Sequence, residues 1–254
     1  MSHNTDFDVT DKTVLITGAS SGIGAHLARA FATRGANVVL CARRRENLDL
    51  LAGEIGENAL AASMDVTSPN SVRQAFVAAE QAFGPVTVLI NNAGVARNGQ
   101  SWEQAEGDWD FVMDVNLKAV WRVAKEAAAR MLAHKMNGSI INISSILGVG
   151  TQPGYTLYAT SKAGVIQMTR TMALELFGKG IRVNALCPGY FQTEMNDAFF
   201  SSTKGQAYVR KTPPGRLGQL EELVGPALLL ASEAGSFING VALPVDGGHH
   251  VRLI

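Results

Sequence analysis

The sequence lacks the features that mark several large classes of protein. It has two cysteines in 254 residues, Cys41 and Cys187, and each lies within an apolar run. Neither a disulfide framework nor a cysteine-ligated metal site is expected, and both cysteines are predicted to be buried free thiols of a reducing compartment. The 22 basic and 22 acidic side chains give no net charge, which argues against a nucleic-acid-binding or anionic-membrane-binding surface.

The chain also lacks long hydrophobic runs. No run approaches the ~20 apolar residues that a membrane-spanning helix needs. Residues 1–10 lack the basic-then-apolar pattern of a signal peptide. Histidine and cysteine are too scattered for metal-ligand spacing, so no metal is predicted. We therefore expect a soluble, cytoplasmic, globular protein.

Seven short apolar runs alternate with longer segments of helical periodicity. Runs that are rich in valine and isoleucine, with little alternation, are typical of parallel strands covered on both faces. The runs are residues 13–17, 37–41, 59–64, 86–91, 139–143, 181–187 and 241–245. Helical patterns include residues 23–34 and residues 108–133, whose apolar stripe contains Trp109. The alternation predicts an α/β fold, in which residues 1–254 form a single doubly wound domain around a seven-stranded parallel sheet.

Residues 190–216 break this alternation. The segment is long, contains three aromatic residues and ends in two prolines and a glycine. It follows the predicted sixth strand and therefore begins at the carboxyl edge of the sheet, where ligands bind in open α/β folds. We expect it to cover the substrate.

A glycine-rich turn follows the first predicted strand and opens the first predicted helix. Its glycines, Gly18, Gly22 and Gly24, have the spacing G-x-x-x-G-x-G. A turn of this kind lets a pyrophosphate approach the backbone and meet the amides of a helix N-terminus. The predicted cofactor-binding residues of the turn are Gly18, Ser20, Ser21, Gly22, Ile23 and Gly24.

The same turn has a second interpretation. Gly18 to Gly22 also fit G-x-S-x-G, the nucleophile elbow of α/β-hydrolases, with Ser20 as the nucleophile. His249 or His250, with Asp246, would complete such a site. Against this alternative, the elbow would lie on the first strand, and the chain has no segment resembling the oxyanion loop of those enzymes.

The second predicted strand is followed by basic residues. A dinucleotide site that prefers NAD usually has an acidic residue here, whereas an arginine favours the 2′-phosphate of NADP. Three arginines stand at positions 43–45, and Arg43 and Arg44 are the candidates for that contact. NADP(H) is therefore predicted over NAD(H). Asp65 and Val66 end the third strand, where Asp65 either caps the next helix or contacts the adenine.

Tyr158 and Lys162 lie at i and i+4 and share one face of a predicted helix. Reduction of a carbonyl needs a proton donor for the developing alkoxide. Lowering the pKa of a tyrosine from about 10 to about 7 requires roughly 4 kcal/mol, which a close ammonium and the charge of an oxidised nicotinamide can supply. Tyr155 has alanine, not lysine, at i+4 and is interpreted as part of the pocket wall.

The order and spacing of several motifs resemble those of the short-chain dehydrogenase/reductase family over residues 10–250. The motifs are Thr17–Gly24, Asn91-Asn92-Ala93-Gly94, Asn116, Ser145, Tyr158-x-x-x-Lys162 and Pro188-Gly189. The resemblance implies a Rossmann-type domain of seven parallel strands, hydride transfer, and a homodimer or homotetramer. It also implies that Lys162 holds the nicotinamide ribose.

The resemblance assigns further roles. Ser145, three residues before Gly148, is expected to hold the substrate oxygen, while Ser144 is better suited to capping a turn. Asn116 is expected to interrupt its helix and to hold a water that relays protons to Lys162. Further cofactor contacts are expected from the ends of the fourth and sixth strands, namely Asn91 at the adenosine ribose, Ala93, Gly94, Pro188, Gly189 and Thr193 at the nicotinamide carboxamide.

The predicted substrate pocket is largely apolar. It is expected to be lined by Ser145, Leu147, Val149, Gln152, Tyr155, Tyr158 and residues 190–210. The favoured substrate is a small carbonyl compound or secondary alcohol. A 3-oxoacyl thioester of acyl carrier protein is the alternative, for which Lys135 and Lys179 would supply the basic mouth. A non-catalytic NADP-binding module is the remaining alternative from a different class.

Overall fold

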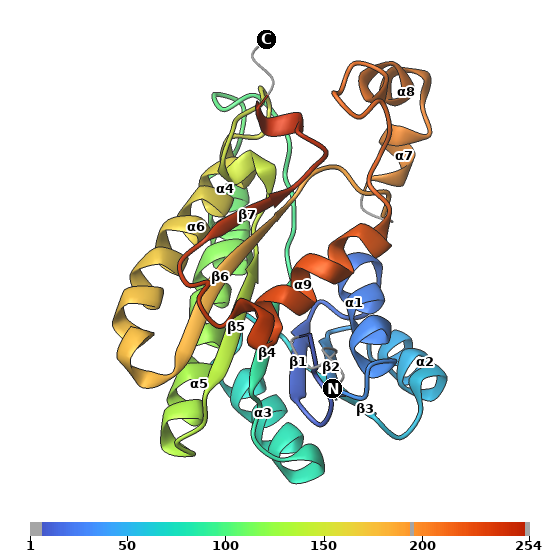
Figure 1. Ribbon diagram of the computed structural model, residues 1–254. Coiled ribbons are helices and arrows are strands. Elements are labelled where there is room, and N and C mark those ends of the chain that lie inside the picture. The colour runs from blue at the N-terminus through green and yellow to red at the C-terminus, as the bar shows by residue number, and fades with distance from the viewer. Residues whose placement is uncertain (1–6, 194–195, 252–254) are drawn as a thin grey trace.

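The computed structural model describes residues 7–193 and 196–251, which form a seven-stranded sheet between two layers of helices (Figure 1). The strands are β1 (Thr13–Thr17), β2 (Asn37–Ala42), β3 (Ala59–Ser63), β4 (Val88–Asn91), β5 (Gly138–Ile143), β6 (Ile181–Pro188) and β7 (Ala242–Val245). Each neighbouring pair is parallel, in the order β3-β2-β1-β4-β5-β6-β7. The doubly wound α/β fold predicted from the sequence is confirmed.

Two groups of helices cover the two faces of the sheet. The helices are α1 (Gly22–Ala32), α2 (Arg45–Ile55), α3 (Pro69–Phe83), α4 (Glu106–Met113), α5 (Ala119–Ala133), α6 (Thr156–Leu176), α7 (Asp197–Phe200), α8 (Thr203–Val209) and α9 (Val224–Ala231). Helices α1, α2 and α9 contribute to the core on one face, and α3, α5 and α6 to the core on the other. Helices α7 and α8 stand apart from the sheet (Figure 1).

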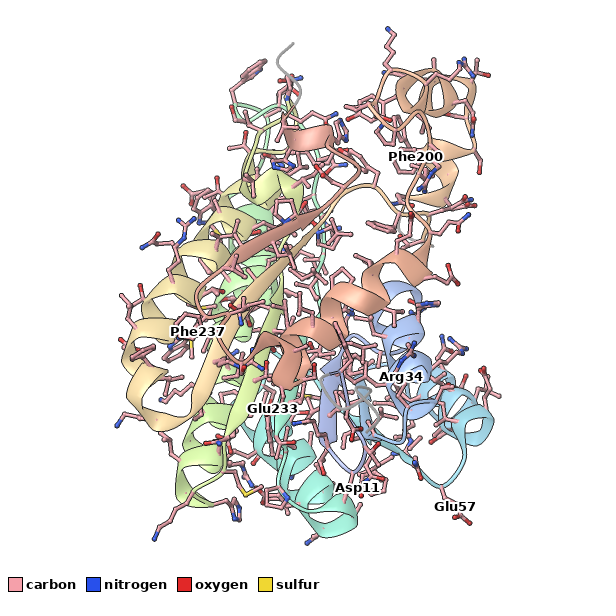
Figure 2. The ribbon with its side chains drawn as sticks, viewed as in Figure 1. Asp11, Arg34, Glu57, Phe200, Glu233 and Phe237 are labelled. Carbon is pink, nitrogen blue, oxygen red and sulfur yellow. The ribbon has the colours of Figure 1, made fainter. Side chains whose placement is uncertain are left out.

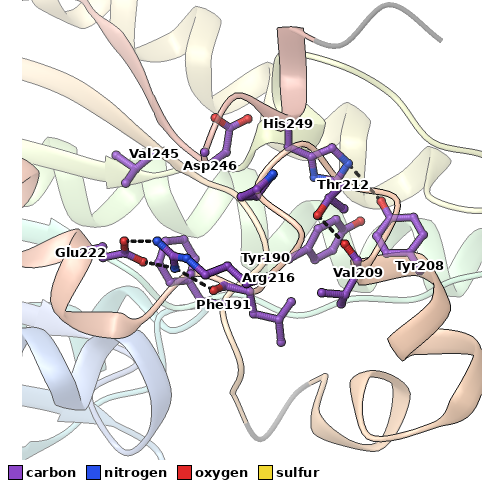
Figure 3. A pocket seen from close by; sticks show the side chains of 14 residues that line it. Tyr190, Phe191, Tyr208, Val209, Thr212, Arg216, Glu222, Val245, Asp246 and His249 are labelled. Atoms are coloured by element: carbon purple, nitrogen blue, oxygen red, sulfur yellow. Dashed lines mark hydrogen bonds and ion pairs between the residues drawn. The ribbon is translucent and has the colours of Figure 1, made fainter.

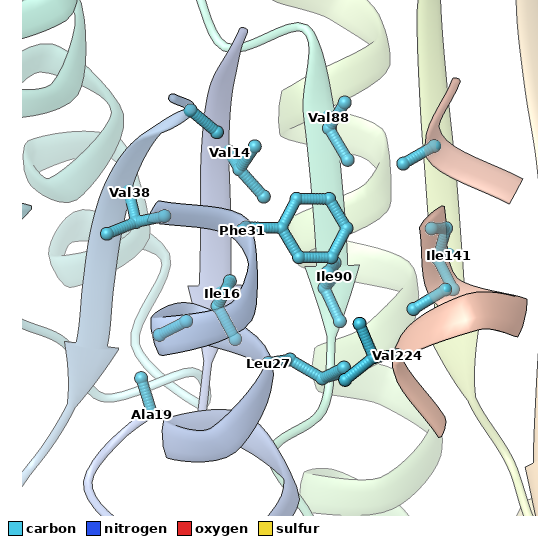
Figure 4. Close-up of a cluster of buried hydrophobic side chains, with 14 of the residues drawn as sticks. Val14, Ile16, Ala19, Leu27, Phe31, Val38, Val88, Ile90, Ile141 and Val224 are labelled. Carbon is cyan, nitrogen blue, oxygen red and sulfur yellow. The ribbon is translucent and has the colours of Figure 1, made fainter. Parts of the chain in front are cut away.

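Alternation along the buried strands divides the core between the two faces. In β1, Val14 and Ile16 belong to one hydrophobic cluster and Leu15 belongs to the other. Phe31 of α1 is fully buried, and its ring lies among side chains of β1, β4 and α9 (Figure 4). Strands with apolar side chains on both faces must be covered on both sides, and this requirement produces the three layers.

The outer strand β3 departs from the expectation of full burial. Its residues are mostly half-buried, because it has a neighbouring strand on one side only. Charged side chains such as Arg34, Glu57 and Glu233 lie on the exposed outside of the molecule (Figure 2). Among the described residues, no helix is long and apolar enough to cross a membrane.

The single helix predicted over residues 108–133 is interrupted. Helix α4 runs into a π-helical turn, Asp114–Lys118, before α5 begins. Trp109, which the sequence pattern assigned to the buried stripe, is 42% exposed. The π-turn inserts an extra residue and rotates α4 relative to the α5 stripe, so one helical period cannot describe both segments.

The buried ring of Phe31 yields a prediction about stability. Phe31→Ala is expected to lower the free energy of unfolding by about 3–5 kcal/mol, because the substitution removes apolar contacts and leaves a cavity between α1 and the sheet. Phe237, which is fully exposed, is the matched control, and Phe237→Ala is expected to change stability by less than about 0.5 kcal/mol. Urea unfolding of the two variants would measure the difference, and equal effects would contradict this account of the core.

Candidate active site

The carboxyl ends of the parallel strands meet at one edge of the sheet and line a cavity of about 890 Å³. The strand order reverses between β1 and β4, which places the cavity at the topological switch point of the sheet. Its lining includes the last residues of β2, β5 and β6 and the residues directly after β1, β3 and β4. Residues that are far apart in the sequence therefore converge on one site.

The glycine-rich turn forms one side of this cavity. Gly18 and Gly22 have φ angles of +66° and +55°, a left-handed conformation that favours glycine. A Cβ atom on Gly18 would lie 2.9 Å from the Cα of Ala93, so the turn packs directly against the segment that follows β4. The predicted residues of the turn that line the cavity are Gly18, Ser20, Ser21, Gly22 and Ile23.

Gly24, by contrast, lies behind the cavity lining. A Cβ atom there would lie 2.5 Å from both the Gly18 carbonyl oxygen and the Asn92 side-chain nitrogen. Gly24 therefore allows α1 to begin close to the turn, and unlike the other predicted residues of the turn it does not line the cavity. Asn92 donates to the carbonyl oxygens of Thr17 and Gly18, which ties the β4 segment to the turn.

The basic segment after β2 divides into two roles. Arg44 donates hydrogen bonds to the hydroxyls of Ser20 and Ser21 and so braces the glycine-rich turn. Arg43 is exposed, and both Arg43 and Arg44 line the cavity. Two cationic side chains thus lie beside the glycine-rich turn.

Asp65 and Val66 both line the cavity. Hydrogen bonds from Thr67 are the largest cause that lowers the pKa of Asp65, and the nearby guanidiniums of Arg43 and Arg122 lower it further. Ser68, not Asp65, caps α3, since its hydroxyl accepts a hydrogen bond from the Ser71 amide. The capping alternative for Asp65 is therefore wrong.

Tyr158 and Lys162 of α6 line the cavity together with Ser145, which follows β5. The Lys162 ammonium lies 5.7 Å from the centre of the Tyr158 ring and donates a 2.8 Å hydrogen bond to the Ile143 carbonyl oxygen. Burial lowers the pKa of Lys162 to about 8. The three groups therefore stand together at the carboxyl end of β5.

The pKa of Tyr158 differs from the expectation. Desolvation raises it, and the interaction with the Ser145 hydroxyl lowers it by less. The protein groups alone therefore do not lower the pKa of this phenol. A phenol with a raised pKa is a protonated acid at neutral pH, which suits it to donate a proton.

Ser145, and not Ser144 as the sequence suggested, caps the turn after β5. The Ser145 hydroxyl accepts a hydrogen bond from the Leu147 amide, whereas the Ser144 hydroxyl donates to the Lys162 carbonyl oxygen at 2.8 Å. Ser145 thus caps the turn and also lines the cavity, and Ser144 holds the backbone of the lysine. Local sequence could not show that α6 passes so close to the end of β5.

Asn116 and Asn91 do not line the cavity. Asn116 lies at the centre of the π-turn, as the expected interruption of the helix requires, but its fully buried amide bonds to both backbone groups of Val95 and to the Ser161 hydroxyl. Asn91 donates to Asn142 and to the Val120 carbonyl oxygen inside the core. The side chain of Asn91 therefore points into the core and not into the cavity, which Ala93 and Gly94 line.

The substrate end of the cavity differs in part from the sequence-based expectation. Leu147, Tyr155, Pro188, Gly189 and Thr193 line the cavity as predicted. Gln152 and Val149 do not line it. Gln152 accepts a hydrogen bond from the Tyr190 hydroxyl, and Val149 is 48% exposed. Tyr190 and Asn196, within the predicted segment 190–210, also line the cavity. The lining residues that sequence reasoning missed include Asn98, Phe111 and Val115.

The hydrolase alternative has no support in the structure. The Ser20 hydroxyl is held by an arginine, and the carboxylate of Asp246 is engaged by the backbone amide and ring of His250. Ser20 and the Asp246–His250 pair do not line a common cavity. Within the described part of the chain, no group of three or more potential ligands could hold a metal ion.

The cavity fits a nicotinamide dinucleotide. The left-handed glycines leave the turn without side chains, and a Cβ on Gly94 would lie 3.6 Å from the Lys162 ammonium nitrogen, so the absence of a side chain keeps that part of the cavity open. Cys41 and Cys187 are free and buried, as the sequence predicted, and burial raises the pKa of the Cys187 thiol to about 11.

Known proteins that resemble this chain are dehydrogenases and reductases. Residues 18–250 match the family described as enoyl-(acyl carrier protein) reductase. The chain is 40% identical over 257 residues to gluconate 5-dehydrogenase of Gluconobacter oxydans, with 100% of both chains covered. It is 40% identical over 242 residues to a 3-oxoacyl-[acyl-carrier-protein] reductase of Thermotoga maritima, with 93% of this chain and 97% of the relative covered.

Solved structures of dehydrogenases have the same fold. A gluconate 5-dehydrogenase from Burkholderia cenocepacia in complex with NADP and tartrate has a TM-score of 0.93 and 37% identity, and 98% of each chain is covered. A short-chain type dehydrogenase/reductase from Mycobacterium marinum has a TM-score of 0.90 and 35% identity, over 96% of this chain and 97% of that chain. The chain therefore belongs to the short-chain dehydrogenase/reductase family of oxidoreductases.

Proposed function

We propose that this oxidoreductase interconverts a carbonyl compound and a secondary alcohol, with NADP(H) as the preferred hydride carrier and Tyr158 as the general acid and base. The observation that carries the proposal is the convergence of Ser145, Tyr158 and Lys162 on the same cavity as the glycine-rich turn and Arg43. A bound nicotinamide supplies the hydride. A non-catalytic NADP-binding module would not need these three side chains in one cavity.

In the reducing direction, Ser145 holds the substrate oxygen and Tyr158 donates its proton to that oxygen. The raised pKa of the phenol keeps the proton in place until negative charge develops on the substrate. Lys162 then stabilises the phenolate and holds the nicotinamide ribose. In the oxidising direction the phenolate removes the proton of the alcohol, a step that the lysine charge favours.

The preference for NADP rests on the segment after β2. Positions 43–45 carry arginine and no acidic side chain, Arg43 and Arg44 both line the cavity, and Arg44 also donates hydrogen bonds to the glycine-rich turn. We assign the 2′-phosphate to Arg43, and the adenine end of the cavity to Asp65 and Val66. A structural relative was solved with NADP, which supports the same preference.

The substrate proposal has two candidates within the same reaction class. The cavity is lined at the substrate end by apolar groups such as Leu147 and Phe111 and by polar groups such as Asn98 and Tyr155. This mixture favours a small, polar carbonyl compound, and the full-length similarity to a gluconate 5-dehydrogenase makes keto derivatives of sugar acids the first group to test. A 3-oxoacyl thioester is the second candidate, supported by similarity to a reductase of that substrate.

Residues 190–216 are proposed to cover the substrate, with the part at 194–195 outside the described residues. The homodimeric or homotetrameric assembly and the cytoplasmic location inferred from the sequence stay predictions.

The role of Tyr158 is tested by removing one oxygen atom. Tyr158→Phe is expected to reduce kcat about 10²–10⁴-fold, because the proton donor is lost while the ring is kept. NADPH affinity is expected to stay unchanged. Tyr155→Phe is the matched control and should keep most of the turnover. Measurement of NADPH oxidation with a panel of keto acids would decide, and full activity of Tyr158→Phe would rule out the proposed role.

The cofactor assignment is tested with Arg43→Ala. Loss of a charge-assisted contact to a phosphate is expected to raise the KM for NADPH about 10- to 100-fold and to leave the KM for NADH nearly unchanged. Arg45, which pairs with Asp49 and does not line the cavity, provides the control. Equal losses for the two cofactors would refute the assignment.

The buried charge of Lys162 predicts a pH-dependent stability. Its pKa is lowered by burial from 10.5 to about 8, so below pH 8 the folded protein holds a charge that the unfolded chain solvates more favourably. Lys162→Met is expected to raise the free energy of unfolding by up to about 3 kcal/mol at pH 7. The gain should shrink as the pH rises from 8 to 10.5, where the ordinary lysine also loses its proton.

Urea unfolding of wild type and Lys162→Met across this pH range would measure the effect. The exposed Lys179 supplies the control, and Lys179→Met should not change the pH dependence. A stability difference between wild type and Lys162→Met that is constant over the range would show that Lys162 does not hold a destabilised charge.

A further inference from the structure

Tyr190 lies between two cavities. It directly follows Pro188 and Gly189 at the end of β6 and lines the large cavity described above. It also lines a second, smaller cavity of about 90 Å³, whose other walls come from α8 and the residues after it and from the segment that follows β7 (Figure 3). Phe191 lines both cavities as well.

The side chain of Tyr190 contacts four separate segments of the chain. Its hydroxyl donates a 2.7 Å hydrogen bond to Gln152, in the loop before α6. Its ring makes edge-to-face contacts with Phe200 of α7 and Tyr208 of α8, at centroid distances of 5.3 and 5.6 Å. The ring of His249, in the C-terminal 3₁₀ turn, lies 5.6 Å away.

The backbone of Tyr190 joins the two ends of the long loop that contains α7 and α8. Its carbonyl oxygen accepts a 2.9 Å hydrogen bond from the Gly218 amide, and Phe191 forms an isolated bridge with Gly218. Beyond these contacts, α7 and α8 pack chiefly against each other and stand away from the sheet (Figure 1). The position of a long loop of this kind depends on a few side-chain contacts.

The hydroxyl of Tyr190 is suited to a permanent contact. Burial raises its pKa, so the phenol remains protonated and can donate to Gln152 throughout the neutral range. Tyr208 adds a second tie, because its hydroxyl lies 3.3 Å from Nε2 of His249. The same aromatic group therefore joins α7, α8, the C-terminal turn and the segment before the candidate catalytic helix.

We propose that Tyr190 is a specificity-determining residue, which fastens α7 and α8 over the substrate end of the large cavity and separates that end from the smaller cavity. This inference deepens the proposed function and rests on it for the identity of the substrate. With the ring in place, the substrate chain ends at Tyr190. Without it, the smaller cavity becomes an extension of the pocket, and longer carbonyl substrates fit.

The first test compares substrates of increasing length. Wild type, Tyr190→Ala and Tyr190→Phe would be assayed with NADPH and a homologous series of ω-extended keto acids. Tyr190→Ala is expected to prefer longer substrates, with a gain in kcat/KM of about 10-fold for each methylene group that enters the smaller cavity. Tyr190→Phe keeps the ring and should retain the wild-type length preference. An unchanged preference in Tyr190→Ala would overturn the proposal.

The second test does not depend on turnover. Hydrogen exchange of the α8 amides is expected to be faster in Tyr190→Ala than in wild type, because the helix pair loses its anchor. The exposed Phe237→Ala is the control and should leave that exchange unchanged. If Tyr190→Ala fails to fold, Tyr190→Leu, which lacks the edge-to-face contacts and the hydroxyl, takes its place.

The two tests separate the inference from the proposed function. Unchanged exchange in Tyr190→Ala would overturn the fastening role, whatever the substrate is. Faster exchange in Tyr190→Ala, together with no reduction of any carbonyl by wild type, would count against the proposed function and would support the anchoring role of Tyr190.

Discussion

The burial of one charged side chain constrains much of this structure. Lys162 is 3% exposed, its ammonium donates to the Ile143 carbonyl oxygen, and burial lowers its pKa to about 8. A buried ammonium is costly unless it is hydrogen-bonded. The protein accepts this cost at the one position where the end of β5, the start of α6 and the cavity meet.

Several neighbouring residues are explained by the position of that lysine. A Cβ on Gly148 would lie 2.8 Å from the Lys162 carbonyl group, so only a glycine allows the loop after β5 to pass there. Ser144 donates to the same carbonyl oxygen, and Ser161 donates to the carbonyl oxygen of Tyr158. Both candidate catalytic residues thus have a backbone carbonyl held by a buried serine, and the bond from Ser144, which follows β5, limits the movement of α6 relative to the sheet.

A second set of buried hydrogen bonds joins the same helix to the sheet. Asn91 of β4 donates to Asn142 of β5, and Asn142 donates to Thr169 of α6, each at 2.9 Å. The three side chains are almost completely buried, so each hydrogen bond replaces one that water would otherwise make. The asparagine that resembled a ligand contact in the sequence is part of this support, and it sets the distance between the sheet and α6.

The sequence by itself determined the fold and most of the candidate site, because these depend on local patterns. Apolar runs and their spacing dictate a parallel sheet, and the carboxyl ends of parallel strands must share an edge, so the motifs after β1, β2, β5 and β6 were bound to meet. Only the tertiary structure decided which side of each strand or helix a polar residue faces. Asn91 turns into the core, Gln152 bonds to Tyr190 instead of lining the large cavity, and the phenol of Tyr158 gains a raised pKa from desolvation. These outcomes depend on contacts between segments far apart in the chain, and a period counted along the sequence contains no information about them.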